Sequence, residues 1–262
     1  MIIDSLVHVT ADGRWFQTNL DASPDALLRQ MDEAGVERAV VTALAGCIPN
    51  DFVLSVCCRH ANRLIAGASF DPSASPSPEE AVRDFRTQLK DAPFAVLKLH
   101  PRFHRYDPLD PRCLAILREA TTWKRPPAVW IDTLFYYRGG TPRKPVVDTI
   151  HTIVSECPTL TFALLHAGGS WALQVAEAVR DCPNAFLDLS FTLKRYYGSS
   201  LWTDLRYLVQ TFDRRLLFGS DFPEVPIPDA VRLFGELTAG TDAEKVANVA
   251  GRNLEHLLFG RP

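Results

Sequence analysis

Four short polar motifs carry the residue types of an enzyme site, and each one ends an apolar segment. They are Asp4-Ser5-Leu6-Val7-His8, Lys98-Leu99-His100-Pro101, His166-Ala167-Gly168-Gly169 and Gly219-Ser220-Asp221. Asp221 follows the apolar segment 215–218, so its carboxylate is expected where a buried strand opens into a loop. A carboxylate in that place can bind a metal ion or take a proton from water. Burying an acid without a partner is costly, so a buried aspartate is expected to have such a partner or role. Taken alone, Asp221 would also fit a loop aspartate that caps the next helix.

Short apolar segments alternate with amphipathic segments along the chain. The expected strands are 2–9, 38–44, 64–70, 95–100, 128–133, 161–166, 185–190 and 215–218. The expected helices are 24–34, 51–61, one that opens at 77–80, 111–122, 146–157, 170–182, 201–212, 229–237 and 242–258. Strands with so few charges are typical of a parallel sheet covered by helices. Eight βα units without a long linker predict one (β/α)8 TIM barrel domain over residues 1–262.

The bulk composition narrows the class of protein. The chain has 262 residues, 47% of them hydrophobic, which is enough for one large core. A formal net charge of −3 gives no electrostatic reason to expect a nucleic acid partner. No apolar run approaches the roughly 20 residues that span a bilayer, so no membrane partner is expected. The first residues indicate a strand and not a signal peptide, and we therefore expect a cytoplasmic protein. The six cysteines include no CxxC pair, and most of them should simply pack.

Alternation along the expected strands brings the polar residues of the motifs together. Because barrel strands point alternate residues inward, strand 2–9 should turn Ile2, Asp4, Leu6 and His8 to the interior, and strand 161–166 should turn Phe162, Leu164 and His166 there. The titratable residues expected at the carboxyl ends of the strands are His8, Lys98, His100, Asp132, His166 and Asp221. Each of them alone would fit a buried, hydrogen-bonded histidine or a surface charge. Six at equivalent strand ends predict a functional cluster, because the carboxyl ends carry the active site in barrel enzymes.

These motifs, in this order, resemble the amidohydrolase superfamily. The likeness lies with its amidohydrolase-related (amidohydrolase 2) branch of single-domain barrels, which includes hydrolases, lactonases and metal-dependent decarboxylases. The resemblance covers nearly the whole chain. The segments that carry it are Ile2-Ile3-Asp4, Val96-Leu97-Lys98-Leu99-His100-Pro101, Leu165-His166-Ala167-Gly168-Gly169, Leu217-Phe218-Gly219-Ser220-Asp221-Phe222-Pro223 and Asn248-Val249-Ala250-Gly251-Arg252-Asn253-Leu254.

The metal ligands that this resemblance implies are incomplete. The first strand of the family usually ends in His-x-His, but here the pair is Leu6-Val7-His8, and leucine cannot coordinate a metal. The fifth strand usually supplies a histidine, and Asp132 stands in that place. The resemblance then implies a set of His8, Asp132 and Asp221 for one divalent ion, zinc or manganese. The substitutions leave a metal-free site equally open.

Two mechanisms therefore remain open. With a metal, the ion would activate water, Asp221 would take the proton of that water, and His166 would stabilise charge on the substrate oxygen. Without one, Lys98, His100 and Arg102 would supply positive charge, and Asp221 would act as general base towards water. A Schiff base at Lys98 is conceivable, because a lysine buried near other cations can lose its proton.

Aromatic and basic residues in the expected loops suggest the kind of substrate. Trp15 and Tyr136 would suit a flat ring, and Arg102 and Arg138 would suit a carboxylate or phosphate. Solvated loop charges and plain loop packing would produce the same pattern.

From all of this we expect a hydrolase of a small anionic ring compound that cleaves an amide, ester or lactone bond, with Asp221, His166, Lys98 and His100 as catalytic residues. The alternatives are a non-oxidative decarboxylase of an aromatic or unsaturated acid, and a non-catalytic descendant that binds a ligand. A homodimer would be the commonest assembly.

Overall fold

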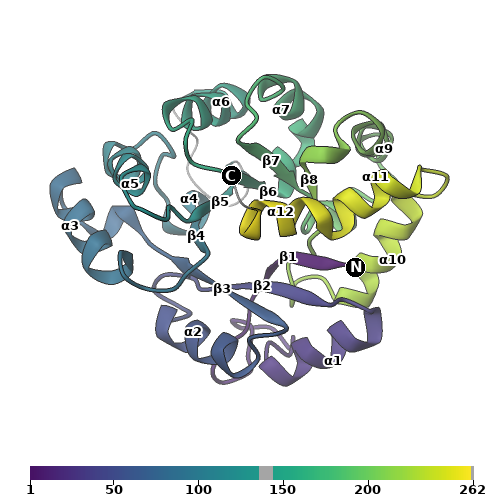
Figure 1. The fold of residues 1–262 in the computed structure, drawn as a ribbon, viewed down its shortest axis with the longest axis horizontal. Helices are drawn as coiled ribbons and strands as arrows, with labels where there is room; N and C mark the ends of the chain where they lie inside the picture. Colours follow the sequence, from purple (N-terminus) through teal and green to yellow (C-terminus); the bar gives the residue numbers. More distant parts are fainter. Residues whose placement is uncertain (136–143, 261–262) are drawn as a thin grey trace.

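The expected (β/α)8 barrel is confirmed. The computed structural model describes residues 1–135 and 144–260, and eight parallel strands stand in it in the order of the sequence (Figure 1). The strands are β1 Ile3–Val7, β2 Arg38–Thr42, β3 Leu64–Ser69, β4 Val96–Leu99, β5 Ala128–Asp132, β6 Phe162–Leu165, β7 Ala185–Asp188 and β8 Leu216–Leu217. Each strand is shorter than the apolar pattern suggested.

Backbone hydrogen bonds join the first strand to the segment after the last one. The amide of Ser5 donates to the carbonyl of Phe218 at 3.0 Å, and the amide of Asp221 donates to the carbonyl of Leu6 at 3.0 Å. A further bond runs from the amide of His8 to the carbonyl of Phe222 at 2.8 Å. These contacts close the ring of strands and place His8 beside Asp221, 213 residues later in the chain.

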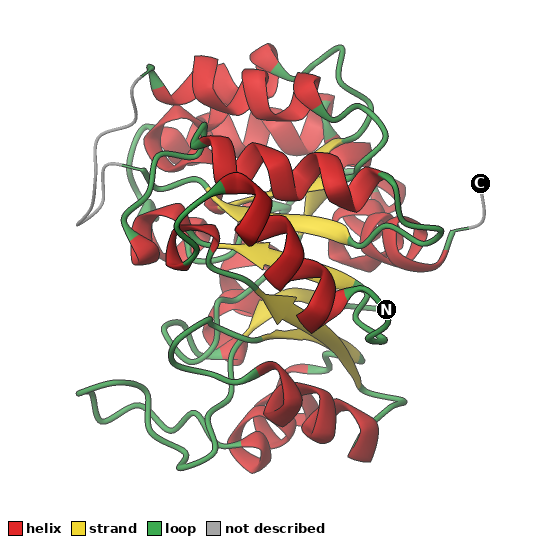
Figure 2. Ribbon diagram, turned by 90° about the vertical axis from the view of Figure 1, so that its left-hand side faces the viewer, coloured by secondary structure: helices red, strands yellow, loops and turns green. Residues whose placement is uncertain are grey.

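Helices flank the strands on the outside (Figure 2). The main ones are α1 Pro24–Ala34, α2 Asn50–Arg59, α3 Pro78–Leu89, α5 Pro111–Thr121, α6 Val146–Glu156, α7 Ala172–Ala178, α9 Leu201–Thr211 and α10 Ile227–Leu237. The expected N-cap Ser23 accepts a hydrogen bond from the amide of Ala26, and Gly35 ends α1 at φ 67°. Two one-turn helices were not expected from the sequence, α4 Pro101–His104 and α8 Thr192–Arg195.

The end of the chain covers the amino-terminal opening of the barrel. The helix expected over 242–258 is divided into α11 Ala243–Ala247, a π-helical turn at Asn248–Arg252 and α12 Asn253–Phe259. Figure 1 shows α12 lying across the ring of strands. Its Leu254 belongs to the interior apolar cluster, together with Leu6, Trp130 and Leu217. The amino-terminal half of the barrel is therefore a packed apolar core, and the polar groups of the candidate site lie at the carboxyl ends of the strands.

Two details of the expected alternation were wrong. In β6 the interior positions are Ala163 and Leu165, whereas Phe162 and Leu164 pack outward under the helices. In β1 the pairing with β2 shifts between Asp4 and Val7, so strict alternation fails there as well. No helix in the described part of the chain is long and apolar enough to cross a bilayer. A cytoplasmic location and a homodimer stay predictions.

Candidate active site

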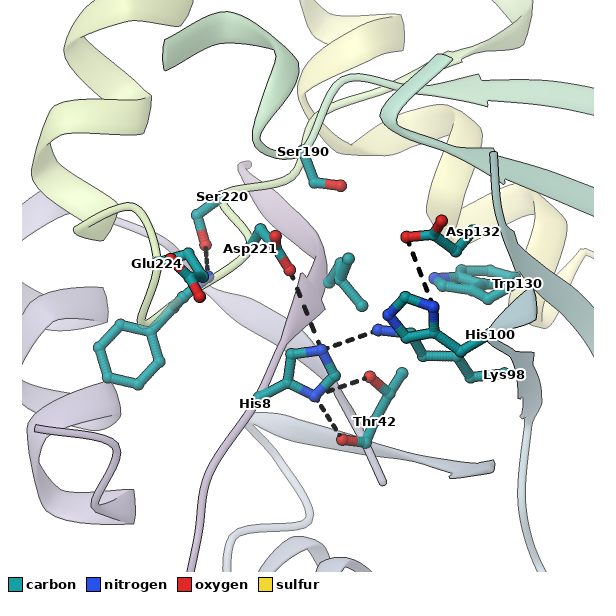
Figure 3. A network of polar contacts seen from close by, with 12 residues as sticks. His8, Thr42, Lys98, His100, Trp130, Asp132, Ser190, Ser220, Asp221 and Glu224 are labelled. Carbon is teal, nitrogen blue, oxygen red and sulfur yellow. Dashed lines mark hydrogen bonds and ion pairs between the residues drawn. The ribbon is translucent and has the colours of Figure 1, made fainter. Parts of the chain in front are cut away.

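His8 links three strands at the carboxyl end of the barrel. Its Nδ1 lies 2.8 Å from the carbonyl oxygen of Thr42 at the end of β2, and its Nε2 lies 2.8 Å from Nζ of Lys98 on β4 (Figure 3). A carbonyl oxygen can only accept, so Nδ1 carries the ring proton and Nε2 accepts from Lys98. Burial and the charge of Lys98 keep the pKa of His8 well below its usual value, and the ring is neutral.

The amine of Lys98 lies at the floor of the site. The side chain is 2% exposed, and its stem stands beside the apolar interior positions of β4. Burial lowers the pKa of Lys98 to about 8, although Asp221 and Asp132 attract the charged form. The ammonium and neutral forms are therefore both populated near neutral pH.

Asp221 reaches the same place from an unusual backbone conformation. Its φ is 68°, a left-handed value that few non-glycine residues adopt. Its Oδ1 lies 3.9 Å from Nε2 of His8. Burial raises the pKa of the Asp221 carboxyl, although His166 and Lys98 attract the ionised form. A carboxyl whose pKa is moved towards neutral is suited to accept and return a proton.

Asp132, on the other side of the opening, is surrounded by donors. Nη2 and Nε of Arg102 lie 2.8 and 3.3 Å from its two oxygens, and Nε2 of His166 lies 3.3 Å from Oδ2. Nδ1 of His100 lies 3.6 Å from the same oxygen. Burial disfavours the charged form, but His100, Arg102 and His166 outweigh it and hold the pKa of Asp132 well below its usual range.

The ring of His166 donates hydrogen bonds from both of its nitrogens in this site. Its Nδ1 donates to the carbonyl of Ser190 at 2.9 Å, and Nε2 faces Asp132. Burial alone would lower the pKa of His166, but the hydrogen bond to Asp132 and the charge of Asp221 raise it above the usual value. The carbonyl of Ser190 and the carboxylate of Asp132 can only accept, so both ring nitrogens act as donors and His166 brings positive charge to the site.

A strained turn, and not strand alternation, brings His166 to the opening. His166, Ala167 and Gly168 have φ values of 64°, 52° and 76°. The hydroxyl of Thr133 accepts from the amide of Gly168 at 2.8 Å, and the hydroxyl of Thr192 donates to the carbonyl of His166 at 2.8 Å. A Cβ on Gly168 would lie 2.6 Å from a methyl group of Val175. Such strain at a binding site persists only where its surroundings hold it.

Two buried carboxylates beneath the site were not predicted as functional. Asp188, at the end of β7, accepts hydrogen bonds from the hydroxyls of Ser5 and Ser190 and from the amide of Ser190 at 3.0 Å. Asp4 accepts from the amides of Ser220 at 2.9 Å and Leu6 at 3.1 Å. Burial raises the pKa of Asp4 to about 7. The rule that selected Asp132, an acid that ends a buried strand, would also have selected Asp188.

A pocket of about 650 Å³ opens above these groups. Trp15 stacks on His8 with ring centroids 5.3 Å apart, and its Nε1 donates to Glu224 at 2.7 Å. Glu224 lines the pocket and was not singled out in the sequence. The other aromatic rings that line it are Phe16, Phe103 and Phe191. Aromatic rings therefore form part of the walls, beside charged and polar side chains, while the floor is charged.

Most residues predicted from the sequence meet at this pocket. His8, Lys98, His100, Arg102, His166, Asp221 and Trp15 all line it. Asp132 lies directly behind them, bound to Arg102. Tyr136 and Arg138, the other two residues expected to bind substrate, lie outside the described residues.

The residues present do not fit the metal site that the resemblance implied. In the described part of the chain, no group of three or more His, Cys, Asp or Glu side chains is placed to hold a metal ion. Nε2 of His8, the nitrogen that would bind an ion, accepts a hydrogen bond from Lys98 instead. Asp132 is held by Arg102. The lysine brings its positive charge directly to Nε2 of His8, the atom that would otherwise be free to bind an ion.

The chain belongs to the amidohydrolase family, whose model matches residues 3–258. No curated protein sequence matches it. An uncharacterised TIM-barrel protein from Bordetella bronchiseptica superposes with a TM-score of 0.78 at 19% identity, and 98% of each chain is covered. A probable 2-pyrone-4,6-dicarboxylic acid hydrolase from Acinetobacter baumannii, solved with citric acid, gives 0.66 at 15%, again with 98% of each chain covered. A 5-carboxyvanillate decarboxylase from Novosphingobium aromaticivorans, solved with manganese, gives 0.69 at 12%, covering 98% of this chain and 96% of that one. At these identities the structural likenesses establish the fold alone.

Proposed function

We propose that the protein is a hydrolase that opens an ester or lactone bond in a small, ring-containing carboxylic acid. One observation carries the proposal: Asp221, with a raised pKa, stands at the floor of a pocket beside a lysine and an imidazolium. A base near cations is the arrangement that acyl hydrolysis needs, since water must lose a proton as the carbonyl oxygen gains charge.

In this mechanism Asp221 accepts a proton from water, and the water oxygen attacks the acyl carbon. Lys98 in its ammonium form and His166 lie around the carbonyl oxygen and stabilise the negative charge that it acquires. The carboxyl of Asp221 then returns the proton to the leaving alkoxide or enolate oxygen. Asp132 stays ionised throughout and keeps His166 protonated and oriented.

The pocket walls support a flat, anionic substrate. The rings of Phe16 and Phe103 lie with centroids 6.1 Å apart and are tilted by 42°, and Arg105 lines the same pocket. Aromatic walls suit a planar ring, and arginine suits a carboxylate. A pyrone or similar lactone that carries a carboxylate has both features, and the Acinetobacter baumannii structure bears the name of a hydrolase for such a compound.

The test is incubation with 2-pyrone-4,6-dicarboxylic acid and simpler carboxylated lactones in water enriched in ¹⁸O. Ring opening should place solvent oxygen in the new carboxylate, and Asp221→Asn should abolish it. Carbon dioxide release without oxygen incorporation would establish the decarboxylase instead. If Asp221→Asn left both turnover and ligand affinity intact, the catalytic interpretation would be wrong.

Metal dependence needs a separate measurement. Because Nε2 of His8 is hydrogen-bonded to Lys98, which itself brings positive charge, we propose that the chain's own residues carry the reaction. Elemental analysis of the untagged, active protein tests this. Near-stoichiometric zinc or manganese that is required for turnover would contradict it.

A further inference from the structure

The surroundings of the Lys98 amine suit a neutral, nucleophilic amine better than a permanently charged ammonium group. It lies at the floor of the pocket and is the one lysine among the described residues that line it. A single hydrogen bond is found for Nζ within the described residues, the 2.8 Å contact with Nε2 of His8. An ammonium group has three N–H donors, so this buried position is poorly matched to a permanently charged lysine.

His8 is arranged to accept a proton from this amine. The carbonyl of Thr42 fixes the ring proton on Nδ1, and this leaves the lone pair of Nε2 directed at Nζ. No rotation of either side chain is needed for the transfer. A nucleophilic amine with a base in hydrogen-bond contact is the usual arrangement for attack on a carbonyl carbon.

We propose that Lys98 is an amine nucleophile that forms an imine with the carbonyl carbon of a small oxo acid. This goes beyond the proposed hydrolysis, because a carbon–nitrogen double bond forms at a ketone and no acyl bond is cleaved. The remaining pocket groups suit the same ligand. His166 and Arg105 offer positive charge to its carboxylate, and Asp221 can exchange a proton with its carbonyl oxygen.

The steps balance within the site. Lys98 first gives a proton to Nε2 of His8, and the nitrogen lone pair then attacks the carbonyl carbon while the oxygen takes a proton from the acid form of Asp221. The attacking nitrogen then gives a proton to the carboxylate of Asp221. The hydroxyl of the carbinolamine takes the proton held on Nε2 of His8 and departs as water, while the nitrogen lone pair forms the C=N bond and both side chains return to their starting forms. Overall the ammonium group loses two N–H bonds, the ketone loses its oxygen as water, and the iminium product keeps the original charge.

Reductive trapping tests the proposal on the full chain. The protein is incubated with pyruvate and sodium cyanoborohydride, which reduces an imine to a stable secondary amine, and modified lysines are located by peptide mass spectrometry. Labelling of Lys98 should exceed labelling of the exposed Lys124 by at least about tenfold. Equal labelling of the two lysines, or no label on Lys98, would overturn the proposal.

Variants sharpen the result. Lys98→Arg and Lys98→Met should lose the rapidly formed adduct, and Lys124→Arg should keep it. If either Lys98 variant fails to fold, the positions of the labelled lysines in the wild-type protein decide the question. The outcome is separable from the proposed function: trapping without lactone hydrolysis supports the imine and contradicts the hydrolase, and hydrolysis without trapping does the reverse.

Discussion

Asp132 and Asp221 lie at the same end of one barrel and are both buried, yet their surroundings act on them in opposite directions. Asp132 is bound by Arg102 and faces two histidines, and its pKa is held well below the usual range. Asp221 has charged neighbours but no arginine fork within the described residues, and burial raises its pKa. Two carboxyls whose pKa values are driven apart indicate separate roles. Asp132 is a fixed charge that organises cations, and Asp221 is the group that exchanges protons.

The largest expected effect comes from removing the proton-exchanging carboxyl. Asp221→Asn should lower kcat/KM for the lactone substrate by about a thousandfold, since a general base contributes on that scale. Its unfolding free energy should stay within about 1 kcal/mol of the wild type, because the amide carries no buried charge. Steady-state kinetics and urea unfolding measure the two quantities. A large loss of stability would show that Asp221 is structural and would remove the contrast.

Asp132→Asn, in contrast, should lower the free energy of unfolding. Replacing the carboxylate leaves Arg102 and His166 without their counter-charge, and breaking a buried ion pair costs about 3 kcal/mol or more. Urea unfolding of the two Asn variants side by side provides the comparison. Equal stabilities would mean that the contacts of Arg102 with Asp132 contribute nothing to folding.

Asp4, a buried carboxyl beneath the site, also has a shifted pKa. Its raised pKa, about 7, means that its stabilising contribution is fully present below the unfolded pKa near 3.8 and is lost as pH rises through 7. Relative to Asp4→Asn, the wild type should therefore lose about 2 kcal/mol of stability between about pH 5 and about pH 7. Unfolding curves of both proteins across that range test this. A constant difference would show that Asp4 does not titrate there.

The smallest effect is a change in the pH profile of hydrolysis. Activity should rise as Asp221 ionises, above the usual range of an aspartate, and fall near pH 8 as Lys98 loses its proton. Lys98→Arg should move the alkaline fall upward by at least about one unit, because arginine stays charged. An unchanged alkaline limb would assign that titration to another group.

The sequence predicted the fold well because strand hydrophobicity and helix caps are local signals. Ser23 and Gly35 bound a helix as expected. The site was predicted in outline, since residues at strand ends must converge in a barrel. His166 was placed correctly for the wrong reason: Phe162 and Leu164 face outward, and a left-handed turn turns the histidine back to the opening.

The contacts between the side chains of the site could not be predicted from the sequence. Nothing local in the sequence indicates that Arg102 binds Asp132 or that Lys98 meets His8, because those contacts join separate parts of the chain and depend on side-chain reach. The one-turn helix α4, which carries Arg102, was likewise too short to give a periodic signal. For this reason Arg102, expected to bind substrate, is found in an ion pair with the protein itself.

Ring closure also has a consequence for biosynthesis. A ribosome releases β1 early, but the hydrogen bonds between Leu6 and Asp221 and between His8 and Phe222 must wait until almost the whole chain has emerged. Until then the nascent barrel has an open edge at β1, and Lys98 and His8 lack the carboxyl of Asp221. A truncated chain that stops before Asp221 would therefore leave the ribosome with most of the scaffold and none of the proposed hydrolytic activity.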